Sequence, residues 1–279
     1  MSEQSAQLDQ VVHAILASAS YRMISRDLVV RIAAAELGKR RNMKEAIKAT
    51  KNTLHQVAGA YVRGAPRFDE WLVEIQAAQA GGDRRRLLDS CARAMSYHSS
   101  TRERLPILDR FFAETLAACG PIRSVLDLAC GLNPLAIPWM PLAPGATYLA
   151  YDIYSDMMDF VGAFLATIGV EGQAHACDIL HAPPAQAADV AFLLKAIPCL
   201  GQMDKSAGLR LLDAVNARYV LVSFPVSSLT GKGKGMRMNY EAHFGELMSE
   251  RRWPFKRFEF SAELAFVVTK ASVAPFKER

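Results

Sequence analysis

The sequence lacks any long hydrophobic run. Every apolar stretch in its 279 residues is interrupted before it reaches the roughly 20 residues that a membrane-spanning helix needs. Its five cysteines lie far apart, with no C-x-x-C pair and no nearby pair of histidines, which argues against both a zinc site and a disulfide framework. We therefore expect a globular, cytoplasmic protein with reduced thiols, no bound metal and no membrane partner.

Acidic residues are scarce in the first part of the chain. Residues 1–104 contain 17 lysines and arginines against 11 acidic residues, whereas residues 105–279 contain 16 against 17. The net charge of +5 therefore comes from the N-terminal part. This distribution indicates an anionic partner for that part.

Strand-like alternation is absent from residues 6–118, where apolar spacing and turn signals predict five or six helices. After Pro121, short β-rich runs alternate with helical ones, which predicts a parallel sheet with helices on both faces. The predicted strands are 124–128, 147–153, 173–177, 189–194, 219–224, 255–260 and 264–269. The last two are too close for an intervening helix and must form a hairpin. We expect an all-α domain over 1–104 and an α/β domain over 105–279.

The first strand-to-helix turn lacks the glycines of a dinucleotide fingerprint. Of the G-x-G-x-x-G pattern only Gly131 is present, and no P-loop lysine follows. Ala129 is nevertheless small, and small residues allow a ligand to approach the backbone. The missing glycines therefore argue against nicotinamide chemistry and favour another ligand at this turn.

Acidic residues occur at successive strand ends, where a doubly wound sheet binds its ligand. Asp152 ends the second strand and can accept hydrogen bonds from ribose hydroxyls, while Asp178 and Ile179 follow the third and can address an adenine. An acidic rim would repel phosphate. The pattern favours a nucleoside over the alternative that each aspartate merely caps a helix.

A basic row marks one helix of the N-terminal domain. Asn42 and Glu45 form a capping box, which predicts a helix from Met43 to Tyr61. Lys44 lies in its first turn, where the helix dipole disfavours a cation. The row could follow an RNA backbone, although a solvated face is the alternative. Its members are Arg40, Arg41, Lys44, Lys48, Lys51 and His55.

A glycine-rich basic loop follows the fifth predicted strand. Lys232, Lys234 and Arg237 could contact phosphates there, or could belong to an ordinary surface loop. Tyr240 could stack on a base or pack in the core. Lys195 follows the fourth strand and either faces the target or extends its ammonium group to solvent.

Four segments together resemble one family: "LHQVAGAYV" (54–62), "YHSSTRERL" (97–105), "LDLACGLNP" (126–134) and "VSFPVSSLTGKGKGMRMNY" (222–240). They are similar to the aminoglycoside-resistance 16S rRNA methyltransferases that modify guanine N7 in the decoding site. The resemblance covers nearly the whole chain. In the first motif, D-x-G-x-G-x-G, this chain has Ala129 and Asn133 in place of two glycines; alanine is small, and asparagine tolerates left-handed backbone.

The resemblance implies a seven-stranded Rossmann-like class I methyltransferase domain preceded by an all-α domain that docks on the assembled 30S subunit. It implies S-adenosyl-L-methionine as cofactor and 16S rRNA as partner. Nothing in the sequence predicts a self-complementary patch, so we expect a monomer with no protein partner. Arg102 and Arg104 are expected in a turn just before a helix that Pro106 can start. By the resemblance, Arg104, or secondarily Arg102, would hold the methionine carboxylate. The remaining expected cofactor contacts are Ala129, Gly131, Asn133, Asp152, Ile153, Asp178, Ile179 and Leu194. The expected target-base pocket comprises Lys195, Ser223, Pro225 and Tyr240.

Two alternatives stay open at this point. One is a methyltransferase that acts on a small molecule and uses the helical domain as a lid. The other is a non-catalytic RNA-binding protein with a vestigial methyltransferase fold. For the favoured reaction no general base is expected, because guanine N7 carries a lone pair and no proton.

Overall fold

A seven-stranded sheet forms the centre of the computed structural model, which describes residues 3–58, 66–204, 206–226, 234–249 and 251–270. The strands are β1 (Ser124–Leu128), β2 (Thr147–Asp152), β3 (Gly172–Ala176), β4 (Ala188–Leu194), β5 (Ala217–Pro225), β6 (Phe255–Glu259) and β7 (Glu263–Thr269). Their order is β3-β2-β1-β4-β5-β7-β6. Strands β1 to β5 are parallel, and β7 is antiparallel to both β5 and β6. The seven predicted strands and the final hairpin are confirmed.

Helices surround this sheet and also form the N-terminal part of the chain. The described part before β1 contains seven α-helices, more than the five or six predicted, because a six-residue helix was taken for a turn. They are α1 (Glu3–Leu16), α2 (Arg26–Leu37), α3 (Met43–Ala58), α4 (Phe68–Ala80), α5 (Arg84–Met95), α6 (Ser99–Arg104) and α7 (Leu108–Leu116), with a 3₁₀ turn η1 (Leu105–Ile107). After β1 come η2 (Asn133–Trp139), α8 (Ser155–Thr167), α9 (Ala196–Met203), α10 (Ala207–Ala214) and α11 (Lys234–Ser249).

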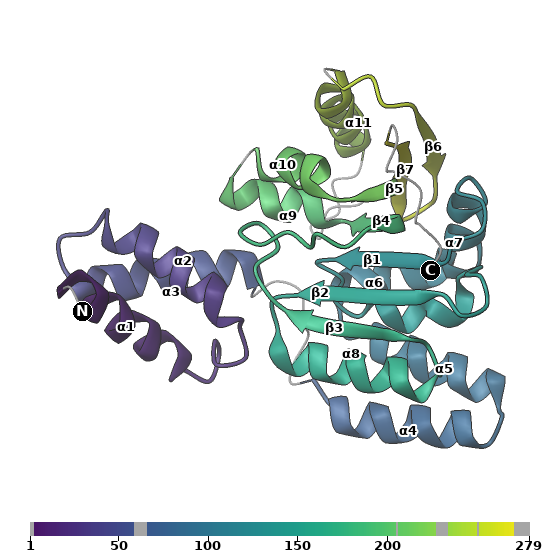
Figure 1. Cartoon of the computed structure of the whole chain (residues 1–279), viewed down its shortest axis with the longest axis horizontal. Helices are drawn as coiled ribbons and strands as arrows, with labels where there is room; N and C mark the ends of the chain where they lie inside the picture. The colour runs from purple at the N-terminus through teal and green to yellow at the C-terminus, as the bar shows by residue number, and fades with distance from the viewer. Residues whose placement is uncertain (1–2, 59–65, 205, 227–233, 250, 271–279) are drawn as a thin grey trace.

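The two faces of the sheet bury different helices, as alternation along a strand requires. Phe192 of β4 packs with α4, α5, α7 and α8 on one face. Its neighbour Leu193 packs with α9, α10 and α11 on the other. In Figure 1, α4, α5 and α8 lie along one side of the sheet and α9 to α11 along the opposite side. The predicted arrangement of helices on both faces is confirmed.

Helices α1 to α3 form a lobe with a hydrophobic core of its own. Val11, Val29 and Leu54 meet in that core, which touches the sheet domain through Ile153 and Tyr154. Helices α4 and α5 instead share the core of the sheet, through residues such as Trp71 and Cys91. We propose that the structural division therefore lies between α3 and α4; the boundary between residues 104 and 105 stays a prediction.

The predicted capping box begins α3. The Asn42 side chain accepts a hydrogen bond from the Glu45 amide at 2.9 Å and donates one to the Glu45 carboxylate at 3.0 Å. This reciprocal pair satisfies a donor that the first helical turn leaves without an intrahelical partner. The described helix runs to Ala58, and the predicted end at Tyr61 lies outside the described residues.

Among the described residues, no helix is both long enough and apolar enough to cross a bilayer. The carboxyl ends of β1, β2 and β3 point toward the lobe of α1 to α3 (Figure 1). A ligand at the strand ends would therefore lie between the sheet and this lobe.

Candidate active site

The turn after β1 is tied to the end of β2. Ala129 and Gly131 both adopt left-handed backbone, with φ of 52° and 53°. The Gly131 amide donates to Asp152 Oδ2 at 2.8 Å, and the Ile153 amide donates to Asp152 Oδ1 at 2.7 Å. Burial raises the pKa of Asp152, which these hydrogen bonds partly offset. The Tyr154 amide also hydrogen-bonds this carboxylate. A carboxylate has about four acceptor sites, so one remains for a ligand hydroxyl.

The side of Gly131 that would carry a Cβ faces a histidine ring. A Cβ there would lie 2.7 Å from Cε1 of His98, closer than atoms can approach. Burial, assisted by the nearby charges of Arg104, Lys195 and Arg102, lowers the pKa of His98 to about 4. A neutral imidazole therefore packs on the turn, so glycine is required here for a protein contact as well as for its left-handed backbone.

Asn133 does not occupy left-handed backbone, so the expected reason for its tolerance in the motif was wrong. It is the first residue of η2 and is buried. Its amide nitrogen donates to Asp127 Oδ2 at 2.9 Å, and its carbonyl oxygen accepts from Arg104 Nη1 at 2.8 Å. Asparagine serves here because its side chain both donates and accepts, which a glycine could not do.

Asp127 lies inside β1 and is almost completely buried, at 1% exposure. Its Oδ2 also accepts a hydrogen bond from the Tyr148 hydroxyl at 2.6 Å. Burial raises the pKa of Asp127 to about 6. Its Oδ1 is buried with no hydrogen-bond partner among the described residues. An acceptor in this state is costly unless a ligand donor reaches it.

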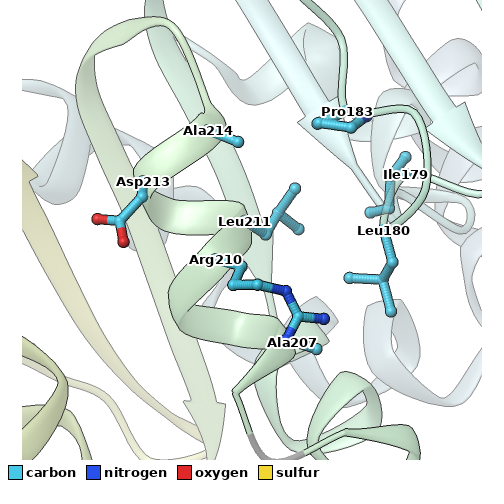
Figure 2. A pocket seen from close by; sticks show the side chains of 8 residues that line it. All are labelled: Ile179, Leu180, Pro183, Ala207, Arg210, Leu211, Asp213 and Ala214. Atoms are coloured by element: carbon cyan, nitrogen blue, oxygen red, sulfur yellow. The ribbon is translucent and has the colours of Figure 1, made fainter.

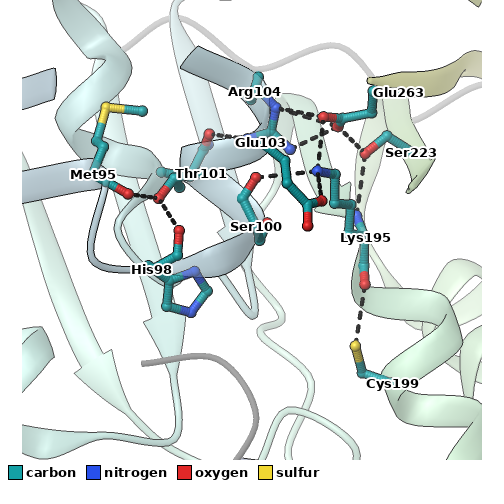
Figure 3. Close-up of polar contacts among 11 residues, drawn as sticks. Met95, His98, Ser100, Thr101, Glu103, Arg104, Lys195, Cys199, Ser223 and Glu263 are labelled. Atoms are coloured by element: carbon teal, nitrogen blue, oxygen red, sulfur yellow. Dashed lines mark hydrogen bonds and ion pairs between the residues drawn. The ribbon is translucent and has the colours of Figure 1, made fainter. Parts of the chain in front are cut away.

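A buried ion pair joins α6 to β7 (Figure 3). Arg104 and Glu263 both have side chains with 0% exposure, and their closest nitrogen and oxygen atoms are 2.7 Å apart. Arg104 donates from Nε and Nη2 to this carboxylate and from Nη1 to Asn133. Burial alone would raise the pKa of Glu263, but the charges of Arg104 and Lys195 hold it below its usual value. Arg104 lies in a helix, so the predicted turn was wrong.

Lys195 is buried at 7% exposure and does not extend to solvent, so the alternative of a solvated ammonium group was wrong. Its left-handed backbone, with φ of 58°, sends the side chain back over α6. The ammonium group donates to Glu103 at 2.8 Å and to the Ser100 carbonyl at 3.2 Å, and lies 3.4 Å from Glu263. Ser223 donates to Glu263 and accepts from the Lys195 amide.

Arg102 differs from Arg104 in what its side chain meets. Its Nη1 is buried and has no hydrogen-bond partner within the part of the chain that the structure describes. Both arginines lie on α6, close enough to His98 to affect its pKa. The structure thus offers a buried donor at Arg102, while the donors of Arg104 are directed at Glu263 and Asn133.

The residues predicted to contact adenine lie at the end of β3. The Asp178 carboxylate pairs with Arg31, and its Oδ1 accepts from the Leu180 amide at 3.1 Å. Ile179 is 5% exposed, and Leu194 at the end of β4 is equally buried. Both apolar side chains are therefore already packed against protein.

A cavity of about 510 Å³ lies on the far side of this turn, against α10. Ile179 and Leu180 face it across from Leu211, while Asp213 points away (Figure 2). Arg210 at its rim pairs with Asp204 at 2.7 Å. The cavity thus carries no unpaired charge from Arg210 to recognise a ligand.

The structure presents most of the predicted RNA-contacting row on α3. Arg41, Lys44, Lys48 and His55 are exposed, and Lys51 is half-buried. Arg40 precedes the helix and pairs with Glu36 at 2.8 Å. The row therefore faces outward from the lobe, as contact with RNA requires.

The predicted residues after β5 are only partly described. Lys232 lies outside the described residues, while Lys234 and Arg237 belong to the first turns of α11. Tyr240 is half-buried and stacks on Phe224 with ring centroids 5.1 Å apart, which favours the core alternative for this ring. Pro225 ends β5 opposite Glu263.

Sequence reasoning missed Glu263, Glu103 and His98. Only Glu263 carries a sequence signal that could have revealed it, because it is a charged residue at the start of an otherwise apolar strand. Glu103 and His98 lie on or beside a helix whose burial the sequence does not show. Their roles arise from contacts between segments far apart in the chain.

The same chain organisation occurs in proteins of known type. Residues 17–267 match the ribosomal RNA methyltransferase (FmrO) family. This chain belongs to that family. It is 39% identical over 265 residues to the 16S rRNA (guanine(1405)-N(7))-methyltransferase of Micromonospora rosea, covering 94% of this chain and 97% of that protein. It is 35% identical over 264 residues to the enzyme of the same name from Serratia marcescens, covering 94% and 98%.

Solved structures give the same result. The 16S rRNA methyltransferase RmtF, crystallised with S-adenosyl-L-homocysteine, superposes with a TM-score of 0.82 at 30% identity, covering 97% of this chain and 100% of that one. The 16S rRNA methylase RmtB superposes with a TM-score of 0.77 at 30% identity, covering 95% and 98%. The predicted family and the methyltransferase fold are confirmed.

Replacing the buried carboxylate should destabilise this family member strongly. In Glu263→Gln the two cations Arg104 and Lys195 lose their shared counter-charge in a dry interior, so the free energy of unfolding should fall by about 3 to 5 kcal/mol. Urea denaturation measures this change. The matched control is Glu259→Gln, which removes a half-exposed ion pair with Arg257 and should cost less than about 1 kcal/mol.

The difference between wild type and Glu263→Gln should shrink as the pH falls below 4.5, the usual pKa of this carboxyl. The folded-state pKa is the lower one, so the stabilisation is present above 4.5 and is lost as Glu263 becomes protonated. Equal effects of Glu263→Gln and Glu259→Gln at neutral pH would contradict the assignment of a buried, stabilising charge.

Proposed function

We propose that this protein transfers the methyl group of S-adenosyl-L-methionine to N7 of the guanine of 16S rRNA named in its relatives, within the assembled 30S subunit, and so gives aminoglycoside resistance. The observation that carries the proposal is the identity with 16S rRNA methyltransferases, which extends through the helical lobe and the sheet domain alike. The similarity therefore covers both the lobe, which would contact the RNA, and the sheet domain, which would bind the cofactor. The protein would act as a monomer in the cytoplasm.

Two buried polar atoms, one an acceptor and one a donor, match the methionine end of this cofactor in chemical type. Asp127 Oδ1 is an acceptor without a partner among the described residues, and Arg102 Nη1 is a buried donor in the same state. An α-amino acid carries an ammonium donor and a carboxylate acceptor. We assign the ammonium group to Asp127 and the carboxylate primarily to Arg102, with Arg104 holding Asn133 in place beside them.

The nucleoside half fits the ends of β2 and β3. Asp152 would accept a hydrogen bond from a ribose hydroxyl, and the Ile153 backbone continues this edge. Asp178 and Ile179 would contact the adenine, with Leu194 and the small residues Ala129 and Gly131 shaping the remaining walls. Acidic groups of this kind suit hydroxyl and amino donors and repel phosphate.

The residues proposed for the target-base pocket adjoin the charged cluster. Lys195 and Ser223 are held by Glu263, so they would form a rigid wall beside the reacting atoms. Pro225 and Tyr240 would border the opening. Presenting the guanine here requires that it leave its stack, at a cost of a few kcal/mol that contacts in the pocket must offset.

The chain's task in this reaction is alignment. The bound cofactor supplies an electrophilic methyl group on a sulfonium ion. Guanine N7 offers a lone pair and no proton, so no side chain has to act as a base; His98, with its low pKa, stays neutral and in place. Asp127, Arg102 and Asp152 would bind and orient the cofactor. The buried cluster of Arg104, Lys195 and Glu263 would keep water out of the site. Such positioning can contribute roughly 7 to 11 kcal/mol.

Purified protein should methylate one guanine of 16S rRNA. Incubation with labelled S-adenosyl-L-methionine and either intact 30S subunits or naked 16S rRNA, followed by cleavage at N7-methylguanine, locates the modification. We expect label at a single decoding-site guanine and only in assembled subunits, because the lobe needs a folded surface to dock on. Cofactor binding without transfer to either substrate would contradict the proposed substrate.

The basic row of α3 should be needed for docking and not for cofactor binding. Changing Lys44, Lys48 and Lys51 together to glutamate reverses the charge of the row, so subunit binding in a pelleting assay should fall by at least about tenfold at moderate salt. The affinity for S-adenosylhomocysteine should stay unchanged. Unaltered docking would contradict the electrostatic role of α3.

Substitution of the two arginines of α6 should affect different properties: cofactor affinity for Arg102 and stability for Arg104. Arg102→Met removes the free donor, so calorimetry should show about tenfold or greater loss of affinity for S-adenosylhomocysteine with little change in stability. Arg104→Met removes the guanidinium that pairs most closely with the buried Glu263 and should lower the free energy of unfolding by about 3 kcal/mol or more. Arg110→Met, on an exposed pair, is the control. Wild-type affinity in Arg102→Met would refute the assigned carboxylate contact.

A further inference from the structure

The lobe of α1 to α3 touches the sheet domain at the turn after β2. The Ser25 amide donates to the Ile153 carbonyl at 2.7 Å, and the Ser155 amide donates to the Met23 carbonyl at 2.8 Å. Ile24 and Tyr154 lie between these bonds and form an isolated antiparallel bridge. The segment before α2 is therefore fastened, backbone to backbone, to the residues that directly follow Asp152.

Helix α2 also holds the turn after β3. Asp27 accepts a hydrogen bond from the Asp178 amide at 2.8 Å, and Arg31, one helical turn later, pairs with the Asp178 carboxylate. Burial acts to raise the pKa of Asp27, but its hydrogen bonds, first of all the one from the Asp178 amide, hold that pKa below its usual value. The Asp178 side chain is only 3% exposed, so its carboxylate needs the Arg31 cation and the Leu180 amide to compensate for the lost contact with water.

These two turns are the ones assigned above to the ribose and the adenine. The sheet places them side by side, because β2 and β3 are paired and Asp152 lies opposite Ala176. The lobe therefore contacts the same two turns that would bind the nucleoside. Without Arg31, the nearly buried Asp178 carboxylate would lose the cation that pairs with it. The turn would then have to rearrange to bring this carboxylate into contact with water.

We propose that Asp27 and Arg31 are positioning residues of the cofactor site, and that docking of the lobe on RNA and binding of the cofactor therefore strengthen each other. The inference rests on the proposed function, because it takes the nucleoside cofactor and the RNA partner from it. It adds that the helical lobe is itself part of the cofactor site.

The coupling follows from how the lobe is built. Leu54 of α3 and Val29 of α2 are buried in one core, so a partner that fixes α3 also fixes α2. When α2 is fixed, the turn at Asp178 stays in the conformation that binds the nucleoside. A bound nucleoside stabilises the same conformation of this turn. Each ligand therefore reduces the conformational entropy that is lost when the other binds. By linkage, each raises the affinity for the other by the same factor.

The first experiment uses the free protein and S-adenosylhomocysteine in a calorimeter. Arg31→Gln should weaken binding by about tenfold, within the range typical of coupled sites. Arg31→Lys keeps the charge and should recover part of the loss. The matched control is Arg26→Gln on the same helix, whose side chain is 64% exposed and pairs with Asp9; it should bind as wild type does.

Thermal unfolding curves first establish that all variants are folded. If Arg31→Gln then binds S-adenosylhomocysteine as tightly as wild type, the positioning role is overturned. A lobe that had merely unfolded would also lose binding to 30S subunits, so retained pelleting of Arg31→Gln with subunits shows that the loss is local. Absence of binding by the wild type itself would instead refute the proposed function. The two failures are therefore distinguishable.

The second experiment repeats the titration with saturating 30S subunits. Wild-type affinity for S-adenosylhomocysteine should rise by about fivefold or more, and the rise should be smaller in Arg31→Gln, because the link through Asp178 is cut. In turnover, the loss in Arg31→Gln should fall on the KM for the cofactor more than on kcat. An equal rise in both proteins, or no rise in the wild type, would overturn the coupling.

Discussion

The buried ion pair of Arg104 and Glu263 is the contact on which the site depends. It joins a short helix that precedes the sheet to the last strand of the chain, 159 residues away. Glu263 also holds Ser223 and lies beside Lys195, while Arg104 holds Asn133 and through it Asp127. A buried pair of this kind contributes little net stability compared with apolar packing, but its geometry admits few alternatives. Its effect is to fix α6 over the ends of β1, β4 and β5.

The first turn of the sheet shows how a family motif can be kept with different residues. Ala129 retains the left-handed backbone that a glycine would supply, at a modest energetic cost, and Gly131 retains the space that His98 fills. Asn133 takes a third route, because its value lies in two side-chain hydrogen bonds and not in its backbone. Asp127 of the same motif and Arg102 of α6 each keep one buried polar atom, Oδ1 and Nη1, without a hydrogen-bond partner among the described residues.

The lobe of α1 to α3 has two faces with different tasks. Its exposed row on α3 is suited to an RNA backbone, and its α2 side holds the turns after β2 and β3. Helices α4 and α5 share the hydrophobic core of the sheet, and the short helix α6 that follows them carries the arginines of the site. In the proposed function, the lobe that would recognise the RNA and the turns that would bind the cofactor therefore meet at the ends of three parallel strands.

The sequence by itself determined the seven strands, the hairpin, the capping box of α3 and the identity of the family, because these depend on local periodicity, turn residues and short motifs. It also marked Asp152 and Asp178 through their positions at strand ends. Only the tertiary structure decided which groups are paired: Glu263, Glu103 and His98 were missed, Lys195 was buried instead of solvated, and Arg102 replaced Arg104 as the available donor. These outcomes depend on desolvation and on contacts between segments far apart in the chain, and neither is encoded in any local pattern.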